Sequence, residues 1–291
     1  KFSLPFVEFM NEHFDNKKQC FIYLMPKNPM FQIPVWYKNV IVINKPEELN
    51  FNLKKVEKIF LHSLYPPTTI PYLYKNKYLL DHCYWIVWGY DIYNKTDSEQ
   101  ALYVKNNVKA VITTFDKKLY QEKYNKDKKV IELPFYPSVI KQSLLDIPVN
   151  KDNNCITIQI NNSADDSTLE MLDVLAKFKN ENIKIITVVS YAKKEFNDEI
   201  LKKGQEIFKD KFSALTEYLS PEKYAEYIRN TDILILNQNR QQGVGNTRCN
   251  LYLGHKVFIR NEVNTYKRFI SQGFKIFDTN SIKDMTFNQF I

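Results

Sequence analysis

The residues best suited to chemistry lie between two apolar runs in the last third of the chain. The apolar run 232–236 is followed by a polar segment that holds two of the six glycines. Glycines let a backbone approach a ligand closely, and the unpaired N–H groups at the start of a following helix attract an anion. An arginine adds a bidentate contact to a phosphate. The segment therefore predicts a pyrophosphate site made by Arg240, Gln241, Gln242, Gly243, Gly245 and Asn246.

A plainer interpretation of this segment stays open, in which the glycines only make a turn and Arg240 faces water. The position of the segment favours a site. It follows a continuous apolar run, which is typical of a strand buried on both faces of a parallel sheet. Ligands of such sheets bind beyond the carboxyl ends of the strands.

Two more loops of the same half follow predicted strands. "NNSADDS" begins at residue 161, and we expect Asn162 and Ser163 to contact a ligand there. Asp165 or Ser167 could instead cap the next helix. Tyr191 follows the predicted strand 183–189, where it either stacks on a base or sugar or simply packs.

The first half offers two candidates for a general base. Asp91 follows the aromatic run "YWIVWGY", in which Trp85, Trp88 and the nearby Tyr93 predict an aromatic cluster. A carboxylate in such surroundings gains a raised pKa and can act as a base, although Asp91 could also be a helix or turn cap. His62 ends another predicted strand and is the second candidate, with a structural role as its alternative.

These residues need strands and helices in alternation to position them. We predict strands at 155–160, 183–189, 232–236 and 256–259, with helices between them, and Ser220 and Pro221 begin one such helix. The first half predicts strands at 20–25, 40–43, 58–62, 84–88, 109–114 and from 130. Alternation of this kind indicates right-handed βαβ units and mostly parallel sheets. We therefore expect an α/β chain of two Rossmann-like domains, residues 1–146 and 152–291, facing across a cleft, with a linker near 137–152.

Composition limits the partners. The formal net charge of +8 suits an anionic ligand or surface, but the lysines are scattered, and the group at 125–129 is typical of a solvated turn. No nucleic-acid-binding module is recognisable, so we expect no nucleic-acid partner. The four cysteines form no C-x-x-C pair and predict buried free thiols. No membrane span or secretory signal is evident, and we expect a cytoplasmic protein that can rest on the inner face of the membrane.

Four motifs, in this order, resemble those of the N-acetylfucosaminyltransferases, glycosyltransferase family 56: "WIVWGYDIY", "ITIQINNSADDS", "IKIITVVSY" and "RQQGVGN". The resemblance implies a GT-B fold, a nucleotide-sugar donor in the second domain, an acceptor at the first, and no essential metal or other cofactor. Two positions depart from the family pattern. Asn161 stands where a glycine is usual, and Glu170 where a histidine is usual.

The function implied is transfer of a sugar from a dTDP, UDP or GDP donor to a bacterial surface glycan carried on a polyprenyl diphosphate. The sugar would be fucose or a deoxy-amino sugar like N-acetylfucosamine. Arg240 would offset charge on the leaving group, and Asp91 or His62 would deprotonate the acceptor. The alternative is a protein on the same scaffold that binds a nucleotide or sugar phosphate without catalysis, because a fold does not fix a function.

Overall fold

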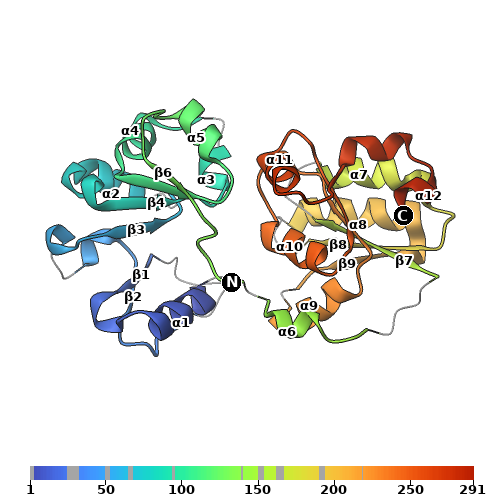
Figure 1. Cartoon of the computed structure of the whole chain (residues 1–291), viewed down its shortest axis with the longest axis horizontal. Helices are drawn as coiled ribbons and strands as arrows, with labels where there is room; N and C mark the ends of the chain where they lie inside the picture. The colour runs from blue at the N-terminus through green and yellow to red at the C-terminus, as the bar shows by residue number, and fades with distance from the viewer. Residues whose placement is uncertain are drawn as a thin grey trace. The chain divides into compact units, whose positions relative to one another are not determined.

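The structure is a computed structural model that describes residues 3–24, 33–49, 53–64, 68–93, 96–138, 140–149, 154–161, 167–189, 194–217 and 219–291. The chain divides into two compact units, Lys1–Val139 and Ile140–Ile291, here named unit 1 and unit 2 (Figure 1). Both are built from parallel strands with helices between them, as the sequence predicts.

Unit 1 contains two parallel sheets within its described residues. One pairs β1 (Phe21–Leu24) with β2 (Val40–Ile43). The other has the order β3-β4-β5-β6 and consists of β3 (Ile59–His62), β4 (Cys83–Ile86), β5 (Ala110–Thr113) and β6 (Val130–Glu132). Its helices are α1 (Ser3–His13), α2 (Thr69–Lys75), α3 (Tyr90–Tyr93), α4 (Glu99–Asn107) and α5 (Lys117–Lys123). The predicted strands lie within three residues of these bounds, and in the described residues they are divided between two sheets.

A buried ionic cluster fixes the segment that follows β4. Lys105, on α4, is 1% exposed, and its Nζ donates to the Asp91 carbonyl oxygen at 2.5 Å and to Asp97 Oδ1 at 2.6 Å. Tyr124 Oη donates to Asp97 Oδ2 at 2.7 Å. Burial raises the pKa of the Asp97 carboxyl, but the hydrogen bonds from Lys105 and Tyr124 outweigh it and hold that pKa below its ordinary value. Because a buried charge without its partner is costly, the cluster ties α4 to both Asp91 and Asp97.

Unit 2 is one six-stranded parallel sheet of order β12-β11-β10-β7-β8-β9. Its strands are β7 (Ile156–Asn161), β8 (Ile183–Val188), β9 (Phe212–Leu215), β10 (Ile233–Leu236), β11 (Lys256–Ile259) and β12 (Phe277–Asp278). Its helices are α6 (Gln142–Leu145), α7 (Ser167–Leu175), α8 (Lys194–Phe208), α9 (Pro221–Arg229), α10 (Val244–Tyr252), α11 (Asn264–Ser271) and α12 (Phe287–Phe290). The four residues of β10 are all buried, as the continuous apolar run predicts.

The strand order places a topological switch point between β7 and β10. From β7 the chain moves outward through β8 to β9, and it then returns to the other side of β7 as β10. Helices that follow β7 and β10 therefore lead away in opposite directions along the sheet. The crevice at the carboxyl ends of two such strands is where open α/β sheets bind ligands.

The predicted linker at 137–152 contains the short helix α6, which packs against α9 and α10. Leu145 joins Ala225, Ile228 and Cys249 in one buried apolar cluster. Gln142 Nε2 also donates to Tyr252 Oη at 2.9 Å. This part of the predicted linker is therefore structured and belongs to unit 2.

The sequence also predicts where α9 begins and that the cysteines are buried. The predicted start of α9 is confirmed, because the Ser220 hydroxyl accepts a hydrogen bond from the Lys223 backbone N–H at 3.3 Å and Pro221 is the first helical residue. All four cysteines are free, but Cys20 is exposed and Cys155 only partly buried. The prediction of buried thiols holds for the other two, Cys83 and Cys249.

Candidate active site

The predicted pyrophosphate segment lies at the switch point of unit 2. β10 ends at Leu236, and the chain runs through Asn237 and Arg240 to Gly243 before α10 begins. A Cβ placed on Gly243 would lie 2.7 Å from Leu236 Cδ2 and 3.4 Å from Asn161 Nδ2. The segment therefore folds back over the end of β10 and reaches the end of β7.

The two glycines of the segment differ in backbone conformation and in the space around them. Gly243 has φ +67°, a left-handed conformation that costs little only for glycine, and it is crowded by Leu236. The turn interpretation therefore explains Gly243. Gly245 lies in the first turn of α10, and a Cβ there would meet no described atom within 4 Å. Backbone geometry and packing within the described chain do not account for Gly245.

The N-terminus of α10 is open to an anion. Its N-cap, Gly243, supplies no side-chain hydrogen bond, and its first turn holds no acidic residue. Asn246 is 8% exposed, and its Oδ1 accepts from Asn250 Nδ2 at 2.9 Å. Asn246 Nδ2 has no partner among the described residues. A helix start with uncapped N–H groups and a buried amide donor is suited to an oxyanion.

Arg240 is partly buried and lies at a shallow recess beside this helix start. The recess is lined by Leu236, Gln238, Arg240, Gln242, Ile259, Val263 and Thr265. Gln238 is 2% exposed, and neither its amide nitrogen nor its amide oxygen has a partner among the described residues. The structure thus brings Arg240 and Gln242 together, whereas Gln241 is half-buried next to them and does not line the recess.

A polar network that the sequence did not predict joins this segment to α7 and to the residue after β11. Arg260 follows β11, and its Nη2 lies 2.7 Å from Glu170 Oε2 in the first turn of α7. Arg260 Nη1 also donates to Asn239 Oδ1 at 2.7 Å, and Asn237 Nδ2 donates to Glu170 Oε2 at 3.0 Å. The sequence carried one usable signal, since Arg260 directly follows a predicted strand at the same edge of the sheet.

Three predicted donor contacts, Asn162, Ser163 and Tyr191, lie outside the described residues. Asn162 and Ser163 come directly after β7, and Tyr191 follows three residues after the end of β8. Their roles stay predictions.

Asp91 is a buried anchor. Its side chain is 0% exposed, and three N–H groups donate to it: Leu64 N at 3.0 Å, Trp85 Nε1 at 2.7 Å and Trp88 N at 3.0 Å. A substrate hydroxyl would have to displace these donors to reach the carboxylate. The geometry favours the alternative of a structural cap, which joins the segment after β3 to the end of β4.

The predicted aromatic cluster is divided among separate contacts. Trp85 is fully buried and contacts Tyr120 and Tyr124 edge-on, whereas Trp88 is 48% exposed and contacts Tyr136. Tyr93 Oη donates to Asp116 Oδ1 at 2.7 Å. Only Trp88 of the three lies near the second candidate base.

His62 shares a hydrogen-bonded group with Trp88 at the carboxyl ends of β3 and β4. Its Nδ1 lies 2.5 Å from Tyr136 Oη, and Trp88 Nε1 donates to the same oxygen at 2.7 Å. Among the described residues His62 Nε2 has no hydrogen-bond partner. Burial lowers the pKa of His62 to about 4, so the ring is neutral near pH 7 and is a weaker base than an ordinary histidine. Tyr136 is the member of this group that the sequence analysis missed.

Comparison with known proteins decides the family. Residues 27–287 match the family described as "4-alpha-L-fucosyltransferase glycosyl transferase group 56". The chain belongs to glycosyl transferase group 56. The predicted family is therefore confirmed, and so is the predicted glycosyltransferase activity.

Solved structures similar to this group 56 chain confirm the GT-B fold class. A glycosyltransferase from Rickettsia africae ESF-5 has a TM-score of 0.56 at 13% identity, over 84% of this chain and 72% of that one. The HepE protein of Anabaena, solved with UDP and glucose, has a TM-score of 0.56 at 12% identity, over 79% and 68%. The UDP-forming α,α-trehalose-phosphate synthase of Burkholderia vietnamiensis has a TM-score of 0.52 at 9% identity, over 78% and 62%.

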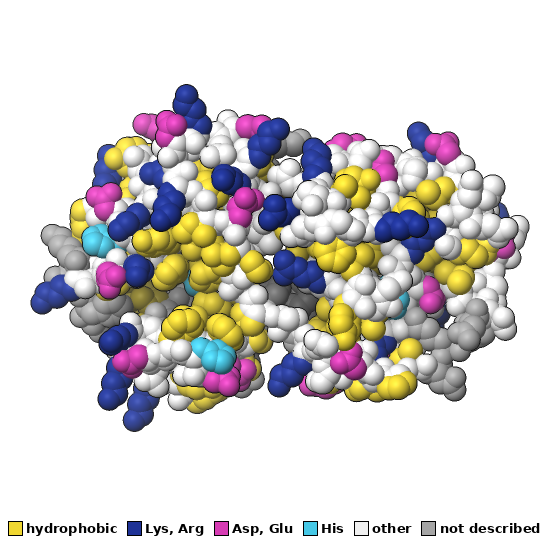
Figure 2. Space-filling model, viewed as in Figure 1, with side chains coloured by type: hydrophobic (Ala, Val, Ile, Leu, Met, Phe, Trp, Pro, Cys, Tyr) yellow, Lys and Arg dark blue, Asp and Glu magenta, His cyan; other side chains and the backbone are white. Residues whose placement is uncertain are grey.

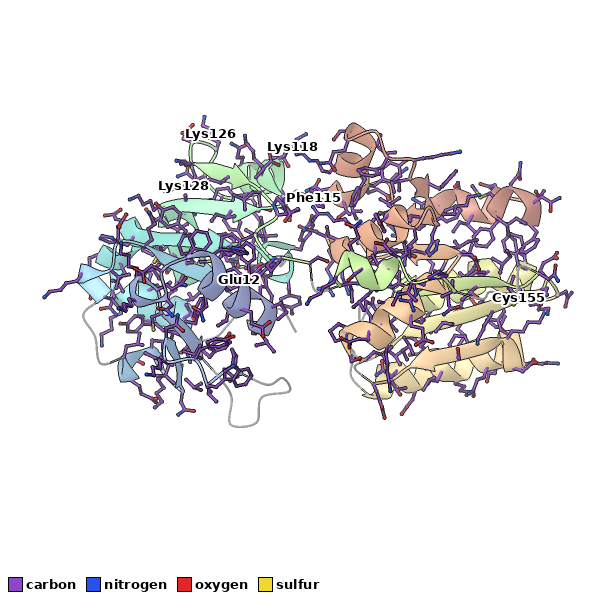
Figure 3. The ribbon with its side chains drawn as sticks, turned by 60° about the horizontal axis from the view of Figure 1, so that its bottom comes forward. Glu12, Phe115, Lys118, Lys126, Lys128 and Cys155 are labelled. Carbon is purple, nitrogen blue, oxygen red and sulfur yellow. The ribbon has the colours of Figure 1, made fainter. Side chains whose placement is uncertain are left out.

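Metal sites, membrane spans and basic patches are the other features that bear on partners. Within the described ranges no three His, Cys, Asp or Glu side chains are grouped so that they could hold a metal ion, and no helix is long and apolar enough to cross a membrane. Lys and Arg side chains are spread over the face seen in Figure 2. Lys126 and Lys128, labelled in Figure 3, lie in the turn between α5 and β6, as predicted for the solvated group at 125–129.

Proposed function

We propose that this group 56 glycosyltransferase binds the diphosphate of a nucleotide-sugar donor at the N-terminus of α10, beside Arg240. The observation that carries the proposal is the contrast between two helices at the switch point. The first turn of α7 contains Glu170, whose carboxylate is paired with Arg260, whereas the first turn of α10 contains no acidic residue and has no side-chain cap. The first turn of α10 is therefore suited to an anion.

Arg240 supplies the charge that the leaving group needs. Transfer of the sugar leaves a nucleoside diphosphate with additional negative charge, and a fixed cation close to it lowers the barrier. A guanidinium can contact two phosphate oxygens at once. We propose that Arg240 fills the role that a divalent metal has in other transferases, and that the reaction needs no metal.

The substrates are proposed from the family description and from the similar structures. The description names a fucosyltransferase, and two of the similar proteins are named with UDP. We propose a 6-deoxyhexose or a related deoxy-amino sugar on dTDP, UDP or GDP. The proposed acceptor is a bacterial glycan on a polyprenyl diphosphate. Family membership favours this enzyme over the alternative of a binding protein without catalysis.

Binding of the diphosphate can be tested at Arg240. We expect Arg240→Ala to weaken the best-bound of dTDP, UDP and GDP by about 10- to 150-fold, because a charge-assisted contact of about 1.5–3 kcal/mol is lost. Isothermal titration calorimetry measures this change. The matched control is Arg268→Ala, since Arg268 is exposed on α11. Equal affinities of the wild type and a folded Arg240→Ala variant would contradict the assignment.

His62 is the proposed general base, because Asp91 is occupied by three backbone and indole N–H groups. General-base catalysis contributes about 10²–10⁴-fold to a rate. We expect His62→Gln to lower the release of nucleoside diphosphate from the donor by at least about 100-fold with an unchanged melting temperature. With a His62 pKa of about 4, a wild-type rate limited by this base should not fall between pH 7.5 and 5.5, and should fall as pH approaches 4.

Two further variants separate this role from that of Asp91. We expect Asp91→Asn to lower the melting temperature, because its amide nitrogen would face buried N–H donors. His13→Gln is the control for His62→Gln, since His13 is exposed on α1. Near-normal turnover in His62→Gln, or a loss of turnover in an Asp91→Asn protein of unchanged stability, would overturn the assignment.

The proposed lipid-linked acceptor requires contact with the membrane, and unit 1 has a surface suited to it. Asn39 Nδ2 donates to Asn11 Oδ1 at 2.8 Å and to the Asn16 carbonyl oxygen at 3.5 Å, which joins the end of α1 to the turn before β2. The joined segments expose Phe14 and Trp36, at 56% and 53%. They also carry three exposed lysines, Lys17, Lys18 and Lys38. Aromatic side chains and lysines are the residues that bind an anionic membrane surface.

We expect the protein to sediment with vesicles that contain phosphatidylglycerol, and to do so less when Phe14 and Trp36 are both changed to serine. Phe274→Ser, an exposed change in unit 2, is the control. Equal sedimentation of all three proteins would rule out this surface, and no sedimentation would contradict the membrane contact itself.

A further inference from the structure

Only one carboxylate oxygen of Glu170, at the switch point, accepts hydrogen bonds from the described residues. The side chain is 55% exposed, and both of its described hydrogen bonds, from Asn237 Nδ2 and Arg260 Nη2, go to Oε2. Oε1 accepts no hydrogen bond from any residue in the described ranges. One oxygen of this carboxylate is therefore fixed by the protein, while the other can accept from a ligand.

The partners of Glu170 hold it in one orientation. Arg260 is only 14% exposed, and its guanidinium bonds Asn239 Oδ1 as well as Glu170. Asn237 is 2% exposed, and its Nδ2 also donates to the Ser167 carbonyl oxygen at 3.0 Å. The Glu170 carboxylate thus joins three parts of the edge: α7, the segment between β10 and α10, and the residue that follows β11. A hydrogen-bond acceptor held this firmly loses little entropy when a ligand binds.

The charge of Glu170 limits what it can bind. A carboxylate repels the diphosphate, but it is a strong acceptor for hydroxyl and amide N–H groups. Asn237 and Asn239 belong to the same short segment as Arg240, so the carboxylate lies close to the proposed diphosphate site. The part of the donor that is neutral, rich in hydroxyls and directly attached to the diphosphate is its sugar.

We propose that Glu170 Oε1 accepts a hydrogen bond from the sugar ring of the donor, and that Arg260 and Asn237 position it for this contact. Glu170 then selects the sugar and contributes nothing to the affinity for a free nucleoside diphosphate. The inference rests on the proposed donor site at α10. It adds to that site a residue that distinguishes a sugar nucleotide from its nucleotide.

The test compares two affinities in the same variant. A panel of UDP-glucose, UDP-N-acetylglucosamine, dTDP-rhamnose and GDP-fucose is first screened against the wild type, and the best binder is titrated beside its own nucleoside diphosphate. We expect Glu170→Gln to lower the affinity for the sugar nucleotide by about 10-fold, because one charge-assisted hydrogen bond is lost. The affinity for the nucleoside diphosphate should fall by less than twofold. Arg260→Gln should act in the same direction, because it releases Glu170 from its orientation.

Asp173→Asn is the matched control. Asp173 lies one turn further along α7, is 63% exposed and forms its own ion pair with Lys203 Nζ at 2.6 Å. It should change neither affinity. Equal weakening of sugar nucleotide and diphosphate in Glu170→Gln, or no change in either, would overturn the role of Glu170. Failure of the wild type to bind any nucleoside diphosphate would instead overturn the donor site, and the inference with it.

Discussion

Strand β10 lies beside β7 and not beside β9, which precedes it in the chain, and the proposed donor site depends on this reversal. It brings the segment 237–243 against the end of β7 and places the starts of α7 and α10 at one edge. Helix starts attract phosphates because the first backbone N–H groups of a helix have no helical acceptor. The side chains then distinguish them, because a carboxylate occupies the first turn of α7 and none occupies that of α10.

In unit 1, buried hydrogen bonds of Asp91 hold the backbone next to the proposed base, His62. Asp91 collects three N–H donors from two strand ends, and its own carbonyl oxygen accepts from the buried Lys105. This arrangement favours a structural role for the Asp91 carboxylate, which also fixes the backbone of Trp88 through its N–H group. The Trp88 indole in turn shares Tyr136 with His62. The carboxylate of the motif "WIVWGYDIY", Asp91, is therefore not the residue that we propose as the base, which is His62.

The sequence predicted well what depends on local pattern. Apolar runs located the strands, Ser220 and Pro221 located a helix start, and the polar segment after β10 located an edge where ligands bind. It did not predict long-range partners. Nothing in the spacing shows that Glu170 and Arg260 form an ion pair across 90 positions, or that Tyr136 joins His62. Asp91 was the more favoured base because sequence shows that a carboxylate has aromatic neighbours but not that backbone N–H groups already occupy it. The helix α6 was missed because its four residues are too few for a periodic pattern.

Amide hydrogen exchange can show whether a diphosphate binds the first turn of α10, as proposed. The first intrahelical bond of α10 runs from Thr247 N to the Gly243 carbonyl oxygen, so the amides of Val244, Gly245 and Asn246 have no helical acceptor. They should exchange rapidly in the free protein. Saturation with the best-bound nucleoside diphosphate should slow their exchange markedly and leave the first turn of α9, capped by Ser220, unchanged. Protection at other segments of unit 2, with unchanged exchange at residues 244–246, would contradict the account.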